Sequence, residues 1–231
     1  MPTALITGAS GGAGRVVTRY FLEQDWHVHA NCHSASGAEE LRAGIAEPLQ
    51  QRLSITVSDL TTPHGVEQFV REAPKPVHAL VHLVGGIRAG TLLEETEPET
   101  FEAMVQLNAL TTFLLLRAVM PLLKATSGAI VTVAARAVLR PEQRKGAYAA
   151  AKAAVVALTQ TAAEEGRPYG VRANVVVPSI LKTPANLAWA QAGEEATWVP
   201  LEDFAAAVFA LCSDAGRAVS GALIPMYGGL A

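Results

Sequence analysis

The sequence has little of what marks several other classes of protein. It contains 2 cysteines in 231 residues, too few for a disulfide framework, and a net charge of −3 with no basic block of the kind that binds nucleic acid. Its apolar runs are far shorter than the roughly 18 residues of a membrane helix, and the N-terminus opens into a predicted strand where a signal peptide would carry charge. Repeats, linkers and low-complexity segments are also missing. We therefore expect one cytoplasmic domain, residues 1–231, whose ligands are small molecules, without nucleic-acid or membrane partners.

Half of the residues are apolar, and short apolar runs alternate with segments of helical periodicity. The runs predict strands at Thr3–Thr7, Trp26–Asn31, Leu53–Val57, Val77–Val84, Gly128–Ala134, Val171–Val177 and Ala222–Met226. The segments between them predict helices at 15–24, 37–51, 63–72, 98–124, from 146 onward, and at 201–213. Near-continuous apolar strands alternating with helices are typical of an α/β fold with a doubly wound parallel sheet.

A glycine-rich turn follows the first predicted strand and opens the first predicted helix. Glycines let a backbone approach a pyrophosphate closely, and the free amides at a helix N-terminus attract its charge. The strand, turn and helix therefore favour dinucleotide binding over a merely tight turn. The predicted cofactor contacts in this turn are Gly8, Ser10, Gly11, Gly12, Ala13, Gly14 and Arg15.

The end of the second strand indicates which dinucleotide is used. An acidic residue there would bind the ribose 2′-hydroxyl of NAD, but the chain reads Asn31-Cys32-His33-Ser34. With no carboxylate to repel a 2′-phosphate, His33, Ser34 and Arg15 are its candidate contacts, and we favour NADP over NAD. The alternative is that these are ordinary loop residues and NAD is used loosely.

Histidines also cluster near this strand, at His27, His29 and His33, beside Cys32. Alternation along a strand places the histidines on one face and the cysteine on the other, and no second cysteine or carboxylate completes a ligand set. We predict no metal site.

Polar or flexible residues follow other strands at the edge where open α/β sheets bind ligands. Asp59, followed by Leu60, lies there, and capping the next helix is the alternative role for an aspartate at this position. Val84 precedes Gly85-Gly86, a pair that would let a cofactor ring lie against the backbone. The remaining predicted cofactor contacts follow the sixth strand, at Pro178, Ile180 and Thr183.

A tyrosine and a lysine lie one helical turn apart at Tyr148 and Lys152, in the alanine-rich segment that begins at Gly146. A nearby ammonium favours a phenolate, so we expect Lys152 to lower the pKa of Tyr148 and make it a proton donor or acceptor. Asn108 lies in an otherwise apolar helix, so it is either a structural hydrogen-bond hub or part of a site.

Two tryptophans, Trp189 and Trp198, fall in the weakly helical segment 184–200. This segment leaves the ligand edge of the sheet, so we expect a lid over a flat or apolar substrate. Packing against a neighbouring subunit explains the tryptophans nearly as well.

Taken together, the glycine turn, Asp59, Asn108, Tyr148 and Lys152 resemble the short-chain dehydrogenase/reductase family in order and spacing. The resemblance implies a seven-stranded Rossmann sheet, hydride transfer to or from a nicotinamide cofactor, and assembly into homodimers or homotetramers. By the same resemblance, Tyr148 is the catalytic acid, Lys152 holds the nicotinamide ribose, Asn108 supports a proton relay and Asp59 lies beside the adenine.

One departure from the family pattern concerns the substrate. A serine usually lies 13 residues before the tyrosine, where this chain has Ala135. The animal dihydropteridine reductases also lack this serine, and the chain resembles them locally at Val84–Gly90, at Ala135, at Pro178–Asn186 and at Trp198–Glu202. That branch reduces a quinonoid ring, which needs no polarisation of a neutral ketone.

The resemblance thus predicts an NAD(P)H-dependent reductase of a quinonoid pterin or another flat, conjugated molecule, with Tyr148 as proton donor. A second interpretation is a general carbonyl or 3-oxoacyl reductase in which Arg136 or a water replaces the serine. A third is a cofactor-binding sensor or scaffold without catalysis.

Overall fold

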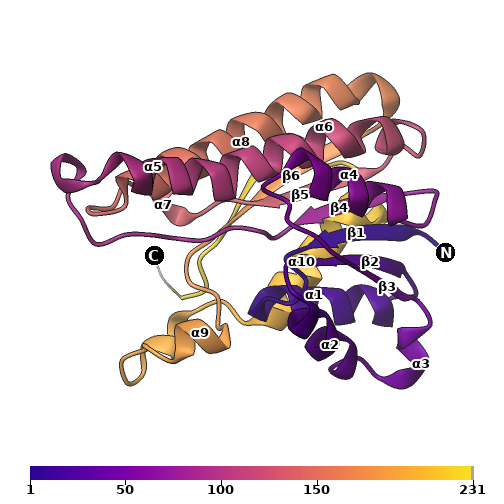
Figure 1. Cartoon of the computed structure of the whole chain (residues 1–231), viewed down its shortest axis with the longest axis horizontal. Helices are drawn as coiled ribbons and strands as arrows, with labels where there is room; N and C mark the ends of the chain where they lie inside the picture. Colours follow the sequence, from indigo (N-terminus) through magenta and orange to yellow (C-terminus); the bar gives the residue numbers. More distant parts are fainter. Residues whose placement is uncertain (230–231) are drawn as a thin grey trace.

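The computed structural model describes residues 1–229, and a single parallel sheet forms their centre (Figure 1). Its seven strands lie in the order β3-β2-β1-β4-β5-β6-β7, and every neighbouring pair is parallel. The strands are β1 Thr3–Thr7, β2 His27–Cys32, β3 Leu53–Val57, β4 Ala79–His82, β5 Ala129–Val133, β6 Arg172–Pro178 and β7 Leu223–Met226. This confirms the predicted doubly wound α/β fold.

Helices cover both faces of the sheet. On one face lie α1 Gly12–Glu23, α2 Ala35–Ala43 and α10 Leu201–Cys212; on the other lie α4 Pro63–Glu72, α6 Thr111–Lys124 and α8 Gly146–Gly166. The shorter helices are α3 Glu47–Gln50, α5 Pro98–Met104, α7 Arg136–Leu139 and α9 Pro184–Leu187. In Figure 1, α7 and α9 flank the edge of the sheet at which the strands end.

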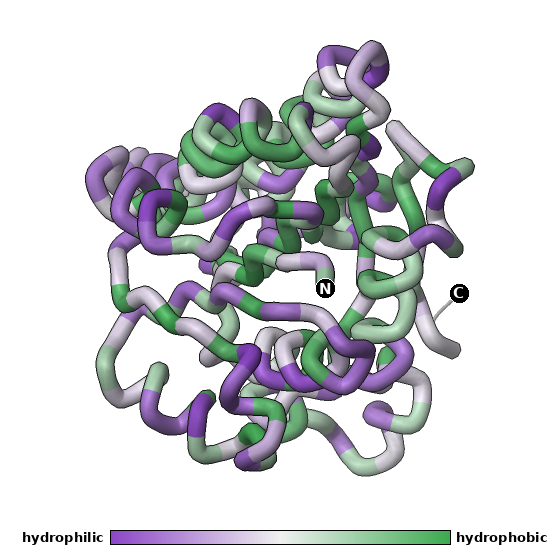
Figure 2. Tube along the Cα trace, turned by 90° about the vertical axis from the view of Figure 1, so that its right-hand side faces the viewer, coloured by the Kyte–Doolittle hydropathy of each residue, from purple (hydrophilic) through white to green (hydrophobic). Residues whose placement is uncertain are grey.

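Each face of the sheet has its own apolar cluster, so most of the strands are buried on both sides. Phe21 of α1 anchors one cluster, where its ring meets Trp26 edge-on at 5.4 Å and Phe209 at 5.1 Å. Phe69 and Leu115 anchor the other. Hydrophilic residues gather in the outer helices and loops (Figure 2). Burial on both faces explains why these strands read as continuous apolar runs in the sequence.

Two predicted helices differ from the observed ones. The predicted helix 37–51 is broken into α2 and α3, because Gly44 ends the first and Pro48 sits in the first turn of the second. The predicted helix 98–124 is continuous but contains a π-helical turn at Val105–Leu110, between α5 and α6. Such turns arise when one extra residue is accommodated in a helix, and this one contains Asn108.

The continuous helix Pro98–Lys124 is long and apolar enough to cross a membrane, judged by length and composition alone. Half of its most apolar window is buried inside the domain, as expected for a core helix of a globular protein. Both cysteines, Cys32 and Cys212, are buried and unpaired.

Candidate active site

The glycine turn between β1 and α1 forms a cradle in which side chains have no room. Gly8 has a φ of +66°, and a Cβ there would lie 3.1 Å from the backbone of Leu83 and Val84. At Gly14 a Cβ would lie 2.1 Å from the carbonyl oxygen of Gly8. Among the described residues no side chain caps the first turn of α1, and the turn contains no acidic residue. The helix N-terminus thus keeps its amides available for an anion such as a pyrophosphate.

A cavity of about 320 Å³ opens beside this turn and brings several predicted cofactor contacts together. Its lining includes Gly8, Gly11, His33, Asp59, Leu60, Val84 and Gly85. The volume falls within the range of small-ligand sites, roughly 300–1,000 Å³. The ends of β2, β3 and β4 therefore meet the glycine turn as the doubly wound topology requires.

A second cavity, of about 530 Å³, lies on the other side of the turn. Its lining includes Ser10, Gly12, Arg15, Thr183, Pro184 and Leu201. Thr183 caps α9 by accepting a hydrogen bond from the amide of Asn186, and its Cβ lies 3.0 Å from where a Cβ on Gly12 would be. The segment after β6 thus closes over the glycine turn, where a bound pyrophosphate would lie.

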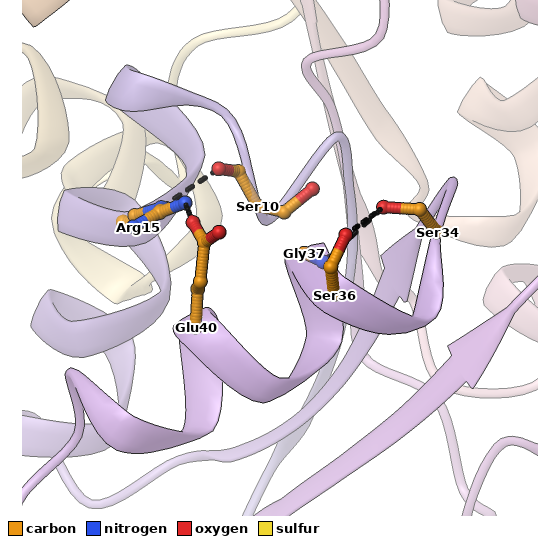
Figure 3. A network of polar contacts seen from close by, with 6 residues as sticks. All are labelled: Ser10, Arg15, Ser34, Ser36, Gly37 and Glu40. Atoms are coloured by element: carbon orange, nitrogen blue, oxygen red, sulfur yellow. Dashed lines mark hydrogen bonds and ion pairs between the residues drawn. The ribbon is translucent and has the colours of Figure 1, made fainter.

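Arg15 is already partnered (Figure 3). Its guanidinium forms an ion pair with Glu40 of α2, and its Nε donates to the carbonyl oxygen of Ser10 at 2.8 Å. Ser34 caps α2 by accepting from the amide of Gly37 at 3.2 Å. His33 is exposed and lines the first cavity with Asp59. Of the three residues predicted to meet a 2′-phosphate, Arg15 would have to leave Glu40 to do so.

Asp59 is exposed at the rim of the first cavity, and its side chain stabilises the turn formed by residues 59–61. Its carboxylate accepts from the amide of Thr61 at 2.9 Å and from the Thr61 hydroxyl at 2.8 Å, and these bonds lower its pKa. The cap of α4 is Thr62, whose hydroxyl accepts from the amide of Gly65. The capping alternative for Asp59 is therefore wrong.

Tyr148 and Lys152 lie on α8; Lys152 is buried and Tyr148 is half-buried. Burial, with a smaller effect of the Glu142 charge, raises the pKa of Tyr148 to about 12. The expectation that Lys152 lowers this pKa is wrong for this structure, because the cost of burying a phenolate dominates. Burial also lowers the pKa of Lys152 to about 8, and its ammonium donates to the carbonyl oxygen of Val133 at 2.8 Å.

Asn108 is fully buried and holds the turn after β4. Its Oδ1 accepts from the amide of Gly86 at 3.2 Å, and its Nδ2 donates to the carbonyl oxygens of Gly86 at 3.1 Å and Met104 at 3.0 Å. A Cβ on Gly85 would lie 2.8 Å from Asn108 Oδ1 and 2.9 Å from Lys152 Nζ. Asn108 is thus a hydrogen-bond hub, and Gly85 brings the backbone within reach of both side chains.

Hydroxyl groups satisfy the carbonyls of the π-helical turn. Thr111 Oγ1 donates to the carbonyl oxygen of Leu107 at 2.7 Å, and Thr112 Oγ1 donates to that of Asn108 at 2.7 Å. A π-helical turn disturbs the regular bonding of a helix, so these side chains stabilise the geometry that presents Asn108.

His82, at the end of β4, connects Thr7 of β1 with Thr111 of α6. This link was not predicted from the sequence. The hydroxyl of Thr7 lies 2.7 Å from His82 Nδ1 and accepts from the amide of Leu83 at 3.2 Å. His82 Nε2 lies 3.4 Å from Thr111 Oγ1. Complete burial, together with the charge of Lys152, lowers the pKa of His82 to about 3, so the ring is neutral. The sequence signal that could have indicated this link is a polar residue, His82, at the end of the apolar strand β4.

The segment after β6 is fixed at its base. Ile180 accepts from the amide of Val199 at 2.9 Å, and Val199 accepts from that of Lys182 at 2.9 Å. Pro178 is the last residue of β6, so it and Ile180 anchor this base. Between these anchors the Trp189 and Trp198 rings lie 5.1 Å apart; Trp198 is 2% exposed and Trp189 57%.

His29 takes part in packing. Its ring stacks on Phe69 at 4.9 Å, and its nitrogens contact Ser54 Oγ at 2.7 Å and the carbonyl oxygen of Phe69 at 3.1 Å. In residues 1–229 no three histidine, cysteine or acidic side chains gather as metal ligands do.

Comparison with known proteins agrees with this geometry. Residues 2–193 match the model of the short chain dehydrogenase family. The chain is 31% identical to the protein FixR of Bradyrhizobium diazoefficiens, over 97% of this chain and 85% of that protein.

Two solved structures share the fold. ElxO with NADP bound has a TM-score of 0.90 at 24% identity, over 99% of this chain and 98% of that one. A 3-ketoacyl-(acyl-carrier-protein) reductase from Brucella melitensis, complexed with NADH, has a TM-score of 0.88 at 25% identity, over 99% and 97%. The chain therefore belongs to the short-chain dehydrogenase/reductase family and is an NAD(P)-dependent oxidoreductase.

Proposed function

We propose that this enzyme reduces a flat, conjugated molecule of the quinonoid pterin type, with Tyr148 as the proton donor. The observation that carries the proposal is the replacement of the usual serine by Ala135. This alanine is 8% exposed and lies directly before α7, where it offers no side-chain donor to a substrate oxygen. A quinonoid ring is driven to reduction by its own electronic structure, so it does not depend on such a donor.

The bound nicotinamide supplies the hydride. The residues of the chain then have separable roles. With a pKa of about 12, Tyr148 keeps its proton at neutral pH and can give it to the reduced substrate. Lys152 would hold the nicotinamide ribose, and its ammonium would compensate the tyrosinate left after proton transfer. Asn108 keeps the Gly85–Gly86 backbone in place, where a cofactor ring would lie against it.

A specific observation also supports a general carbonyl or 3-oxoacyl reductase. Arg136 directly follows Ala135 and is a candidate donor for a ketone oxygen. The Brucella melitensis neighbour is a 3-ketoacyl reductase with 25% identity. This alternative requires Arg136 to donate the hydrogen bond to the substrate carbonyl that the serine donates in other members of the family.

We propose NADP as the preferred cofactor. No carboxylate lies in the segment Asn31–Ser34, where one would repel a 2′-phosphate, and His33 and Ser34 are both exposed there. Arg15 would join them by exchanging Glu40 for the phosphate.

We also propose that the enzyme forms a homodimer or homotetramer through its α5, α6 and α8 face. Phe101 and Phe113 are exposed there, and a cavity of about 360 Å³ lies between α6 and α8. Exposed aromatic residues beside a groove are typical of protein interfaces. Sedimentation of the wild type and of Phe113→Glu tests this: a dimer or larger assembly is expected to dissociate in the variant, and a monomeric wild type would contradict it.

The function is tested by following the absorbance of NADPH and NADH with purified enzyme. Quinonoid dihydropterin and a simple diketone are offered in parallel. We expect rapid oxidation with the pterin alone, faster with NADPH than with NADH. Turnover with the diketone alone would favour the carbonyl reductase.

A further inference from the structure

We propose that the substrate carries a carboxylate, which Arg136 and Arg140 bind beside the ring of Tyr227. The inference rests on the proposed function, because it describes recognition at the same site. None of these three residues is among the predicted cofactor contacts.

The three residues meet at the edge of the sheet where the strands end. Arg136 begins α7 directly after Ala135, and α7 packs against α8, which carries Tyr148. Tyr227 follows the last residue of β7, and its carbonyl oxygen accepts from the hydroxyl of Ser179 at 3.0 Å. The arginines therefore lie among the loops that follow β5, β6 and β7, next to the helix that carries Tyr148.

Both guanidinium groups share one aromatic ring. Arg136 Cζ lies 5.8 Å and Arg140 Cζ 5.7 Å from the centroid of Tyr227. These distances are within the range of cation–π interactions, so the Tyr227 ring contacts both positive charges.

No carboxylate in residues 1–229 forms an ion pair with either arginine. Glu142 lies nearby but pairs with Lys145 at 2.6 Å, and Arg144 donates to the carbonyl oxygen of Gly90 at 2.9 Å. Residues 136–145 contain four basic residues and one acidic residue, within a chain whose net charge is −3. The two cations that contact Tyr227 therefore remain to attract an anion from solution.

Arg136 is partly desolvated as well. Its Nε is shielded from solvent, and no described residue accepts its hydrogen bond. A charged group that has already lost water without gaining a partner gives up less hydration when an anion binds to its outer nitrogens. This favours anion binding at Arg136 over a purely structural role.

The shape of the site favours a carboxylate on a flat molecule. A guanidinium matches the planar, two-oxygen geometry of a carboxylate. Tyr227 supplies one aromatic surface, and the following Gly228 packs against the backbone of Trp198, at the base of the proposed lid. Engagement of Arg136 with a carboxylate also leaves it unable to polarise a neutral ketone, which agrees with the quinonoid chemistry.

The test uses two quinones that differ in one group. A naphthoquinone carboxylic acid and its methyl ester are offered to the holoenzyme with NADPH. We expect the KM of the acid to be about tenfold lower, the effect of one charge-assisted hydrogen bond. In Arg136→Gln and in Arg140→Gln the KM of the acid should rise by about tenfold and that of the ester should stay constant. Arg144→Gln removes the same charge from the same segment, and it should leave the ratio of the KM of the acid to the KM of the ester unchanged.

A binding measurement complements the kinetics. Naphthoate, which cannot be reduced, should quench tryptophan fluorescence of the NADP-loaded enzyme, and Arg136→Gln should weaken this binding about tenfold. Equal KM values for acid and ester, or an equal change in Arg144→Gln, would overturn the carboxylate site and leave the proposed reductase intact. Failure to oxidise NADPH with either quinone or with the dihydropterin would instead remove the proposed function.

Discussion

The cofactor half and the substrate half of the site are built in different ways. In the cofactor half, backbone geometry does the work: Gly8 and Gly14 leave no space for a side chain, and Asn108 bonds to the backbone of Gly86. In the substrate half, side chains such as Arg136 and Tyr227 define the surface, and Ala135 removes a donor. The first half therefore agrees with the glycine turn that the family resemblance predicts, and we propose that the second half determines which substrate this enzyme takes.

Tyr148 is where the two halves meet, so its removal should have the largest effect. Tyr148→Phe keeps the ring and removes the proton donor. We expect kcat to fall by about 100-fold or more, with NADPH binding retained, as measured by steady-state kinetics and cofactor fluorescence. Unchanged turnover would show that the proton comes from elsewhere.

The next largest effect is expected in the cofactor half. Gly14→Ala places a methyl group 2.1 Å from the Gly8 carbonyl oxygen, so the turn must shift. We expect NADPH affinity to fall by about tenfold or more and the melting temperature to drop. Gly44→Ala is the matched control, because a Cβ there meets nothing closer than 3.4 Å. An equal change of NADPH affinity in the two variants would contradict the conclusion that the glycine turn holds the cofactor.

The pH dependence of the reaction tests the pairing of Tyr148 and Lys152. Burial lowers the pKa of Lys152 to about 8, so the ammonium is present below that pH and is lost as pH rises through it. Tyr148, with a pKa of about 12, stays protonated across this range. We expect kcat/KM for reduction to decline above pH 8. Lys152→Arg, whose charge persists, should lose this decline; a flat profile in the wild type would refute the assignment.

A smaller effect concerns cofactor choice. Glu40→Gln frees Arg15 from its ion pair and removes a negative charge near the second strand. We expect the ratio of kcat/KM for NADPH over NADH to rise by a few-fold, because exposed ion pairs contribute about 1 kcal/mol or less. A ratio that does not change would place the 2′-phosphate away from Arg15. Glu23→Gln, which lies on α1 and pairs with Arg19, serves as the control.

The sequence predicts some of these features better than others. The strands were predictable because burial on both faces makes each an apolar run, and the glycine turn because only glycine fits it. The π-helical turn at Asn108 was not predictable, since such a turn depends on tertiary packing. The break between α2 and α3 has local causes, Gly44 and Pro48, which the predicted helix 37–51 did not take into account. The pKa of Tyr148 was predicted with the wrong sign, because spacing reveals the neighbouring lysine but not the burial.

The arrangement of the substrate half was the least predictable. Arg136 begins α7 and Tyr227 follows β7, so they lie far apart in the sequence, and only the folded sheet brings them together. The link from Thr7 through His82 to Thr111 has the same origin. Contacts of this kind join segments that are distant in the sequence, and no local sequence pattern predicts them.

We propose that Ala135 marks a substrate half adapted to quinonoid substrates. Its most direct test is Ala135→Ser, assayed with NADPH against quinonoid dihydropterin and a simple diketone. The restored hydroxyl should raise diketone reduction by about tenfold or more, as expected for one polarising donor, and leave pterin reduction nearly unchanged. A wild type that already reduces the diketone better than the pterin, with no gain from the serine, would contradict the claim.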